Sequence, residues 1–177
     1  TLSLHDALPI WFVFVRVDLE GNPVIEAEAS YVTSTERGTV LEKKGVKIQT
    51  CEHILAALVG MNLDNVIMEL DAPEPPIMDG SAKYFVEAIE KVGIVAQEAE
   101  RHEYIVHEVI SYKNEETGSE ITLIPADEYQ VTTMVDFGTK ILGTQNAYMH
   151  SLSEFKDDIA NARTFSFLHE LEVLLDK

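Results

Sequence analysis

A glutamate and a histidine stand side by side at Glu52 and His53, where the apolar spacing that follows predicts the start of a helix. The start of a helix carries a partial positive charge, which keeps an imidazole neutral and able to bind a metal. The same field favours an ionised carboxylate, as a general base beside a metal-bound water requires. The pair therefore suits hydrolytic metal chemistry. It also fits a dipole-matched surface turn, because one histidine does not make a metal site.

Short strands and a hairpin are predicted before this pair. Apolar and alternating runs predict strands at 11–17 and 24–32, and Lys43-Lys44-Gly45 predicts a hairpin turn. Thr50 is placed to N-cap the helix that Glu52 opens. The predicted buried face of that helix consists of residues at helical spacing, namely Ile54, Leu55, Leu58 and Val59.

A strand at 65–70 and a second helix at 81–92 complete the first half of the chain. Three prolines within 71–76 exclude regular structure between them. Asp79-Gly80-Ser81 has a structural interpretation, since Gly80 permits a tight turn and Asp79 or Ser81 can cap the second helix. The buried side of this helix is predicted to be Phe85, Val86 and Ile89.

The pattern then restarts after an acidic, weakly patterned stretch at 93–101. Strands are predicted at 104–112, 120–124 and 129–137, and a capping box at 151–154 opens a helix towards Ala160. Strands followed by helices, twice over, predict an α+β fold, a two-domain sheet-and-helix sandwich with a similar layer in each half. The predicted domains are 11–97 and 101–177. The second is expected to be incomplete, because residues 165–177 form a helical pattern without a stop signal.

The composition narrows the class of protein further. With 31 acidic and 13 basic residues, the formal net charge is −18, which argues against nucleic acid or an anionic membrane as the main partner. The single cysteine, Cys51, excludes an internal disulfide and fits a reducing cytoplasm. No apolar run has the length of a membrane span. Residues 1–10 match nothing downstream, and we interpret them as a non-native leader.

Five motifs occur in order, and together they resemble the zinc-dependent UDP-3-O-acyl-N-acetylglucosamine deacetylase family, LpxC, in its Bacteroidetes-type version. The resemblance runs from about residue 11 to the end of the chain. The motifs are Arg37-Gly38-Thr39, Thr50-x-Glu52-His53-Ile54-Leu55-Ala56-Ala57-Leu58, Asp64-Asn65, Pro73-Glu74-x-Pro76-Ile77-Met78-Asp79-Gly80-Ser81-Ala82 and Ala162-Arg163-Thr164-Phe165.

This resemblance implies a two-domain α+β hydrolase. It implies removal of the N-acetyl group from UDP-3-O-(3-hydroxyacyl)-N-acetylglucosamine, the committed step of lipid A and lipopolysaccharide biosynthesis, in the cytoplasm of a Gram-negative bacterium. The UDP-linked acylated glucosamine is the expected substrate, and a fused 3-hydroxyacyl-carrier-protein dehydratase is a further expected partner. Neither nucleic acid nor a transmembrane segment is expected.

The family pattern also implies roles for individual residues. His53 matches a Zn2+ ligand, Glu52 the general base, Thr164 the hydroxyl that polarises the scissile carbonyl, and Phe165 a substrate contact. Thr164 equally fits the N-cap of a final helix, and Phe165 fits a core position. Cys51 stands where many members of the family carry Val. As a small apolar residue it can substitute for Val, and it is assigned no chemistry.

Two further zinc ligands and a separate histidine of the family fall beyond the equivalent of Lys177. His150 and Glu154 have the spacing of a substitute pair, but the sequence predicts that they do not share a helix face. The chain by itself is therefore expected to be inactive. Two alternatives stay open: a binding or scaffold protein that has lost the metal, and a metal-free enzyme that uses Glu52 and His53 as an acid–base dyad.

Overall fold

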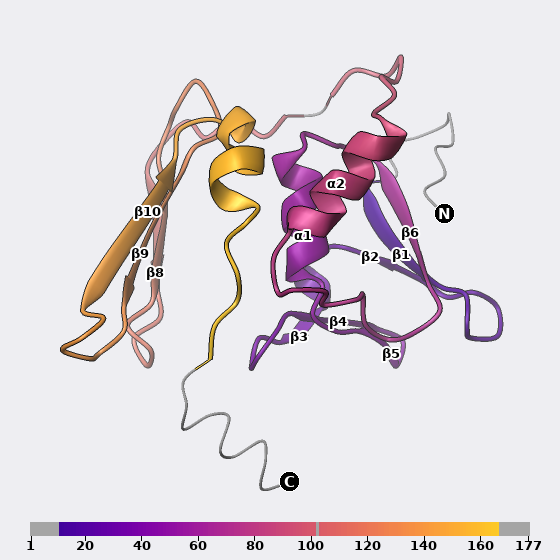
Figure 1. Cartoon of the computed structure of the whole chain (residues 1–177), viewed down its shortest axis with the longest axis horizontal. Coiled ribbons are helices and arrows are strands. Elements are labelled where there is room, and N and C mark those ends of the chain that lie inside the picture. Colours follow the sequence, from indigo (N-terminus) through magenta and orange to yellow (C-terminus); the bar gives the residue numbers. More distant parts are fainter. Residues whose placement is uncertain (1–10, 102, 167–177) are drawn as a thin grey trace, which may run out of the picture. The chain divides into compact units, whose positions relative to one another are not determined.

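The computed structural model describes residues 11–101 and 103–166, coloured along the chain in Figure 1. Its contacts divide the chain into two compact units. The first unit contains the residues up to Ala96 together with those from Phe155 onward, and the second is Gln97–Glu154. The division after Ala96 falls inside the acidic stretch at 93–101, whereas the residues from Phe155 onward group with the first unit instead of the second.

A three-stranded sheet forms the centre of the first unit. Its order is β2 (Val24–Glu26), β1 (Phe12–Arg16) and β6 (Val66–Leu70), with β1 antiparallel to β2 and parallel to β6. Phe14 on the central strand stands opposite Ile25 on one side and Met68 on the other, and all three side chains are buried. The strands predicted at 11–17 and 65–70 are confirmed.

A second three-stranded sheet joins β3 (Val32–Ser34), β4 (Val40–Lys43) and β5 (Val46–Ile48) in antiparallel order. The predicted hairpin between β4 and β5 is confirmed, with Lys44 and Gly45 both at positive φ, as a two-residue hairpin turn requires. The single strand predicted at 24–32 is wrong. Only β2 pairs with β1, and after a 3-10 turn at Ala29–Tyr31 the chain joins the second sheet.

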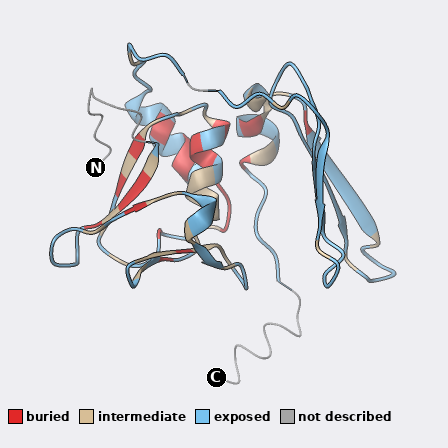
Figure 2. Ribbon diagram, turned by 180° about the vertical axis from the view of Figure 1, so that it is seen from behind, coloured by how far each residue is buried: buried red, intermediate tan, exposed pale blue. Residues whose placement is uncertain are grey.

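Two helices, α1 (Glu52–Gly60) and α2 (Lys83–Val92), contact each other and carry much of the core (Figure 1). Figure 2 shows their buried residues in red. The buried side of α2 is the predicted one. On α1, Leu58 is buried as predicted, but Val59 is 39 % exposed and Ala57 is buried in its place.

The predicted N-cap of α1 is wrong. The helix begins after Cys51, and no side chain caps it. Thr50 has a φ of 50°, in the left-handed region, where the extended backbone of a capping residue is not available. The chain thus enters α1 through a sharp bend, and this bend sets the direction of the residues that follow.

The regular helix predicted from 151 towards Ala160 is also wrong. A 3-10 turn at Leu152–Glu154 leads into a π-helical turn at Phe155–Ile159, in which Ala160 N–H donates to the carbonyl of Phe155 at 2.7 Å. The buried Phe155 ring lies against Gly60 at the end of α1: a Cβ on Gly60 would stand 2.1 Å from Phe155 Cδ1. This contact and the ion pair between Lys156 and Glu90 explain why the segment from Phe155 belongs to the first unit.

Replacing Gly60 with Ala is expected to destabilise the chain by about 1–3 kcal/mol, because the added methyl overpacks the Phe155 ring. This sign opposes helix propensity, which favours Ala over Gly by about 1 kcal/mol. Urea unfolding of the two chains measures the difference. The double variant Gly60→Ala/Phe155→Leu should recover part of the loss, and an unchanged or raised midpoint for Gly60→Ala alone would contradict the packing argument.

The second unit contains two separate antiparallel hairpins. One pairs β7 (Ile110–Lys113) with β8 (Glu120–Leu123), and the other pairs β9 (Val131–Asp136) with β10 (Thr144–Met149). The strands predicted at 120–124 and 129–137 are confirmed. The one predicted at 104–112 is wrong in its first part, since β8 offers partners only from Ile110 onward. The sequence did not predict β10.

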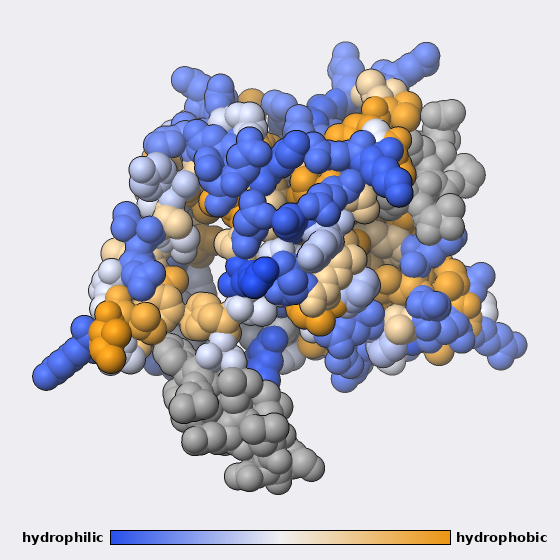
Figure 3. All heavy atoms as spheres, viewed as in Figure 1, coloured by the Kyte–Doolittle hydropathy of each residue, from blue (hydrophilic) through white to orange (hydrophobic). Residues whose placement is uncertain are grey.

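Nearly all strand residues of the second unit are exposed, and Met149 is the one buried residue among its described strands (Figure 2). Apolar side chains such as Ile121, Met134 and Ile141 therefore reach the surface, and Figure 3 shows hydrophobic side chains in orange among the hydrophilic ones. A single two-stranded hairpin has too little area to bury either face. Within 11–101 and 103–166, no helix is long and apolar enough to cross a bilayer.

Candidate functional site

Glu52 and His53 are the first two residues of α1, as the sequence predicted. Glu52 Oε1 lies 4.0 Å from His53 Nε2. The Glu52 side chain is 38 % exposed and that of His53 is 17 % exposed, so the carboxylate is open to solvent and the imidazole is mostly covered. The fold thus brings an acid–base group and a possible metal ligand into contact at the positive end of a helix.

The backbone N–H and carbonyl of Thr39 hold this helix start in place. Its N–H donates to Glu52 Oε2 at 2.9 Å. Its carbonyl accepts from the N–H and the thiol of Cys51, both at 3.4 Å. One carboxylate oxygen of Glu52 is thereby fixed, while Oε1 is the oxygen nearer to His53.

Gly38 makes room for this arrangement. A Cβ at Gly38 would lie 3.1 Å from Thr50 Oγ1 and 3.4 Å from Glu52 Oε1. Sequence reasoning picked out Arg37-Gly38-Thr39 as a motif but did not predict that its backbone contacts Glu52. The presence of a glycine just before the predicted hairpin was the available signal, since glycines in or beside strands often mark close approach of another group.

Cys51 is completely buried between these elements. Burial, and secondarily the charge of Glu52, raises the pKa of its thiol to about 11. The thiol is therefore protonated at neutral pH, and only the thiolate is a strong nucleophile. We expect Cys51 to resist iodoacetamide at pH 8 in the folded chain and to react after unfolding in guanidinium chloride. Mass spectrometry of both samples measures this, and rapid labelling of the folded chain would contradict the burial.

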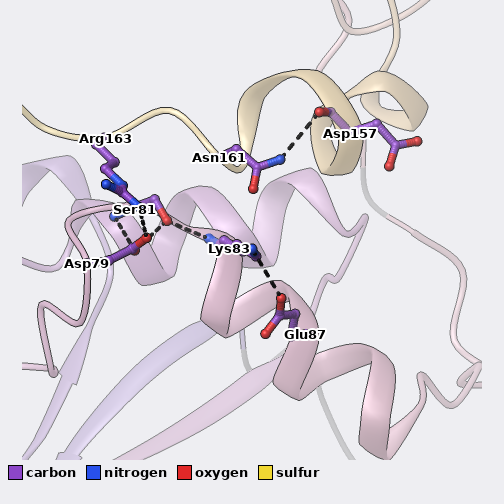
Figure 4. Close-up of polar contacts among 7 residues, drawn as sticks. All are labelled: Asp79, Ser81, Lys83, Glu87, Asp157, Asn161 and Arg163. Atoms are coloured by element: carbon purple, nitrogen blue, oxygen red, sulfur yellow. Dashed lines mark hydrogen bonds and ion pairs between the residues drawn. The ribbon is translucent and has the colours of Figure 1, made fainter.

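Thr164 and Phe165 are held by a different part of the first unit. The Thr164 N–H donates to the carbonyl of Gly80 at 2.8 Å, and Phe165 is exposed. The preceding residue, Arg163, pairs with Asp79 at 3.2 Å between Nη2 and Oδ2 (Figure 4). The helical pattern predicted at 165–177, whose N-cap Thr164 equally fitted, lies outside the described residues from 167 onward, and Phe165 is not helical. The structure therefore groups Glu52 with His53, and Thr164 with the turn that precedes α2.

That turn is internally bonded. Asp79 Oδ1 accepts from the Ser81 hydroxyl at 2.6 Å and from the Ser81 N–H at 3.2 Å. Ser81 Oγ in turn accepts from the N–H of Lys83, the first residue of α2, at 3.3 Å. Figure 4 shows the chain of contacts from Asp79 through Ser81 to Lys83. The prediction that Asp79 or Ser81 is the cap of α2 is wrong, because the N-cap residue is Ala82, which makes no side-chain capping bond. Asp79 and Ser81 instead support the start of α2 from the turn just before it.

The pKa of Asp79 is held below its ordinary value of 3.8, chiefly by the Ser81 hydroxyl and to a smaller extent by Arg163. A carboxyl whose pKa is lowered on folding stabilises the fold above its unfolded pKa, and this contribution is lost as the pH falls through the lowered value. We expect NMR titration of the Asp79 carboxyl to show a midpoint below 3.8. Ser81→Ala should raise that midpoint, and an unchanged midpoint would contradict the assigned cause.

The described residues offer few side chains that could together bind a metal ion. No group of three His, Cys, Asp or Glu side chains that could hold a metal occurs within 11–101 and 103–166. His150 Nδ1 lies 3.7 Å from Glu154 Oε1. The two residues do not share a helix face, as predicted, because His150 precedes the 3-10 turn at Leu152–Glu154. Glu154 folds back because its carboxylate accepts the His150 N–H at 2.8 Å. His53 fits one position of a zinc site, and the described residues do not complete such a site.

The fold and the site together define an α+β protein with a carboxylate–imidazole pair at a helix start, an arrangement suited to hydrolysis. A family model described as "LpxC: UDP-3-O-acyl N-acetylglycosamine deacetylase" matches residues 8–177, and the chain belongs to this family. The resemblance recognised from the five motifs is thereby confirmed.

Curated relatives agree with this assignment. The chain is 47 % identical to a protein named bifunctional enzyme LpxC/FabZ from Porphyromonas gingivalis, with 98 % of the chain and 40 % of that protein covered. It is 40 % identical to a UDP-3-O-acyl-N-acetylglucosamine deacetylase from Thermosynechococcus vestitus, with 91 % of the chain and 55 % of that protein covered. A protein of the same name from Myxococcus xanthus is 38 % identical, with 98 % and 55 % covered. The chain thus spans about half or less of the length of these relatives.

Proposed function

We propose that the whole protein, meaning the full-length polypeptide that carries this sequence, is a zinc-dependent hydrolase. Its reaction removes the N-acetyl group from UDP-3-O-(3-hydroxyacyl)-N-acetylglucosamine, the committed step of lipid A biosynthesis, in the cytoplasm of a Gram-negative bacterium. Family membership supports this proposal. The observation that carries it is the Glu52 carboxylate, which the Thr39 N–H fixes beside His53 at the start of α1.

The residues of the chain have distinct roles in this proposal. His53 would supply one imidazole to a zinc ion, and the bound ion would supply Lewis-acid chemistry for the hydrolysis. Glu52 accepts a proton from the attacking water, and the Thr39 N–H keeps its carboxylate oriented for this step. The Thr164 hydroxyl donates a hydrogen bond to the oxyanion that develops on the acetyl carbonyl, and Phe165 contacts the substrate.

Three parts of the proposal concern how much of the whole protein this chain represents. We propose that the chain alone is inactive, because its described residues offer one zinc ligand where a catalytic site uses about three. The domains predicted at 11–97 and 101–177 would then be a first domain and part of a second. A 3-hydroxyacyl-carrier-protein dehydratase fused to the deacetylase is supported by the bifunctional relative from Porphyromonas gingivalis.

The test is a deacetylation assay on the purified whole protein with the UDP-linked substrate, before and after removal of metal by a chelator. We expect turnover that disappears on chelation and returns with added zinc. Activity that survives exhaustive chelation would instead support the metal-free dyad of Glu52 and His53. No turnover in the zinc-supplemented whole protein would support a binding or scaffold role.

A further inference from the structure

Two motifs that lie far apart in the sequence meet in the first unit. The turn Asp79-Gly80-Ser81 precedes α2, and Arg163-Thr164 lies near the end of the described chain. Two contacts join them: the Arg163–Asp79 ion pair at 3.2 Å, and the hydrogen bond at 2.8 Å from the Thr164 N–H to the Gly80 carbonyl. The first of these is drawn in Figure 4. The Asp79–Ser81 turn therefore does more than begin a helix.

The turn that makes these contacts is itself held in place by hydrogen bonds. Ser81 is completely buried, and its hydroxyl and N–H both bond to Asp79 Oδ1. The other carboxylate oxygen, Oδ2, faces Arg163. Asp79 is thus oriented by the core of the unit on one side and presents its charge to the Arg163–Thr164 segment on the other.

Gly80 is in direct contact with the Thr164 side chain. A Cβ at Gly80 would lie 3.0 Å from Thr164 Cγ2, so the methyl group of Thr164 packs on the glycine. The hydroxyl occupies the other branch of the Thr164 Cβ and does not take part in this contact. The hydrogen bond to Gly80 fixes the main chain of Thr164, and a change of χ1 would move the methyl group off Gly80.

We propose that Asp79, Gly80 and Arg163 form a clasp that orients the Thr164 hydroxyl for the reaction. They are positioning residues, and the inference rests on the proposed function, in which Thr164 acts on the acetyl carbonyl. An exposed ion pair contributes little to overall stability, and the Arg163 side chain is 69 % exposed. Misplacing a reacting group by 1 Å, however, can cost about 10²-fold in rate. The clasp should therefore affect kcat far more than folding.

The first experiment measures kcat and KM of the whole protein with Arg163→Met, Arg163→Lys and Thr164→Val. Arg163→Met is expected to lower kcat about tenfold with the thermal midpoint unchanged, and Arg163→Lys to restore part of that loss because it keeps the charge. In the Thr164→Val background, Arg163→Met should cause no further loss, because the clasp acts through the hydroxyl that is already missing. Equal losses in both backgrounds, or no loss in either, would overturn the inference.

Gly80 offers a test with a matched control. Gly80 and Gly21 share a φ of 79°, so alanine is similarly strained at both positions, but Gly21 has no atom within 4 Å of an added Cβ. We expect Gly80→Ala to lower kcat of the whole protein more than tenfold and Gly21→Ala to leave kcat unchanged. The same kcat for both variants would show that the contact with Thr164 has no catalytic effect.

A third measurement separates the clasp from the proposed function. Hydrogen exchange of a peptide spanning residues 160–166 in the whole protein reports on the Thr164 N–H without requiring activity. Faster exchange of this peptide in Arg163→Met supports the clasp even if the whole protein never deacetylates the UDP-linked substrate. If the wild-type protein is active but exchange of this peptide is the same in Arg163→Met as in the wild type, the clasp is overturned. The proposed function would then remain in place.

Discussion

Glu52→Gln in the whole protein is expected to lower turnover by about 10²-fold or more while the fold and the bound metal remain. An amide has no basic oxygen with which to take a proton from water, and loss of a general base typically costs 10²–10⁴-fold. The substitution should not displace the side chain. The Thr39 N–H donates to Glu52 Oε2 at 2.9 Å, and the glutamine carbonyl can accept the same bond. The assay is steady-state deacetylation with zinc content measured in parallel.

Glu20→Gln is the matched control, because it removes the same charge from an exposed turn before β2. It should leave turnover unchanged, which excludes an effect of net charge alone. If Glu52→Gln kept near-normal turnover, the general-base assignment would be lost. If it lost zinc as well as turnover, Glu52 would be acting on the metal site instead of on the water.

The two helices show which structural features can be predicted from the local sequence pattern. The buried side of α2 could be read directly from its sequence, since the spacing of its apolar residues matches one face of a helix and that face meets the core. The start of α1 at Glu52 was also predictable, but its cap was not. The backbone bends at Thr50, and Cys51 bonds to Thr39, a residue of a preceding loop. Helix-capping rules use only neighbouring residues, so they cannot predict such a long-range backbone contact.

The elements that the sequence pattern did not predict are those whose conformation depends on contact with another part of the chain. The strand β10 is mostly polar, Thr144-Gln145-Asn146-Ala147, and it is a strand because β9 pairs with it along its whole length. The π-helical turn at Phe155–Ile159 coincides with the packing of Phe155 against Gly60. The apparent capping box before it indicated a helix start but not which helix geometry follows.

In the candidate site, too, some features were predictable from the sequence and others were not. The motifs located Glu52, His53 and Thr164. The residue types suggested the chemistry of Glu52 and His53, and the family resemblance implied the role of Thr164. What holds them was not predictable, because the partners of Glu52 and Thr164 are backbone groups of Thr39 and Gly80. A backbone donor or acceptor exists at almost every position, so the sequence carries no mark of which one is used. The glycines Gly38 and Gly80, beside which those side chains pack, are the nearest thing to a signal.

His53→Ala in the whole protein is expected to abolish stoichiometric zinc and, with it, turnover. Catalytic zinc sites use about three protein ligands, so removal of one leaves too few to hold the ion tightly. His53 is well placed to be a ligand, because its side chain is mostly covered and its Nε2 lies beside the Glu52 carboxylate at 4.0 Å. Zinc content by atomic absorption, after dialysis against metal-free buffer, measures the effect.

His150→Ala provides the comparison for this variant. His150 also lies beside a glutamate, Glu154, at 3.7 Å, but its side chain is 66 % exposed and it belongs to the second unit. Its loss should leave zinc content and turnover unchanged. Full zinc in His53→Ala would refute the ligand role of His53. If both His53→Ala and His150→Ala lost zinc, the position of His53 at the start of α1 would not distinguish it from His150. The assignment of His53 as the ligand would then fail.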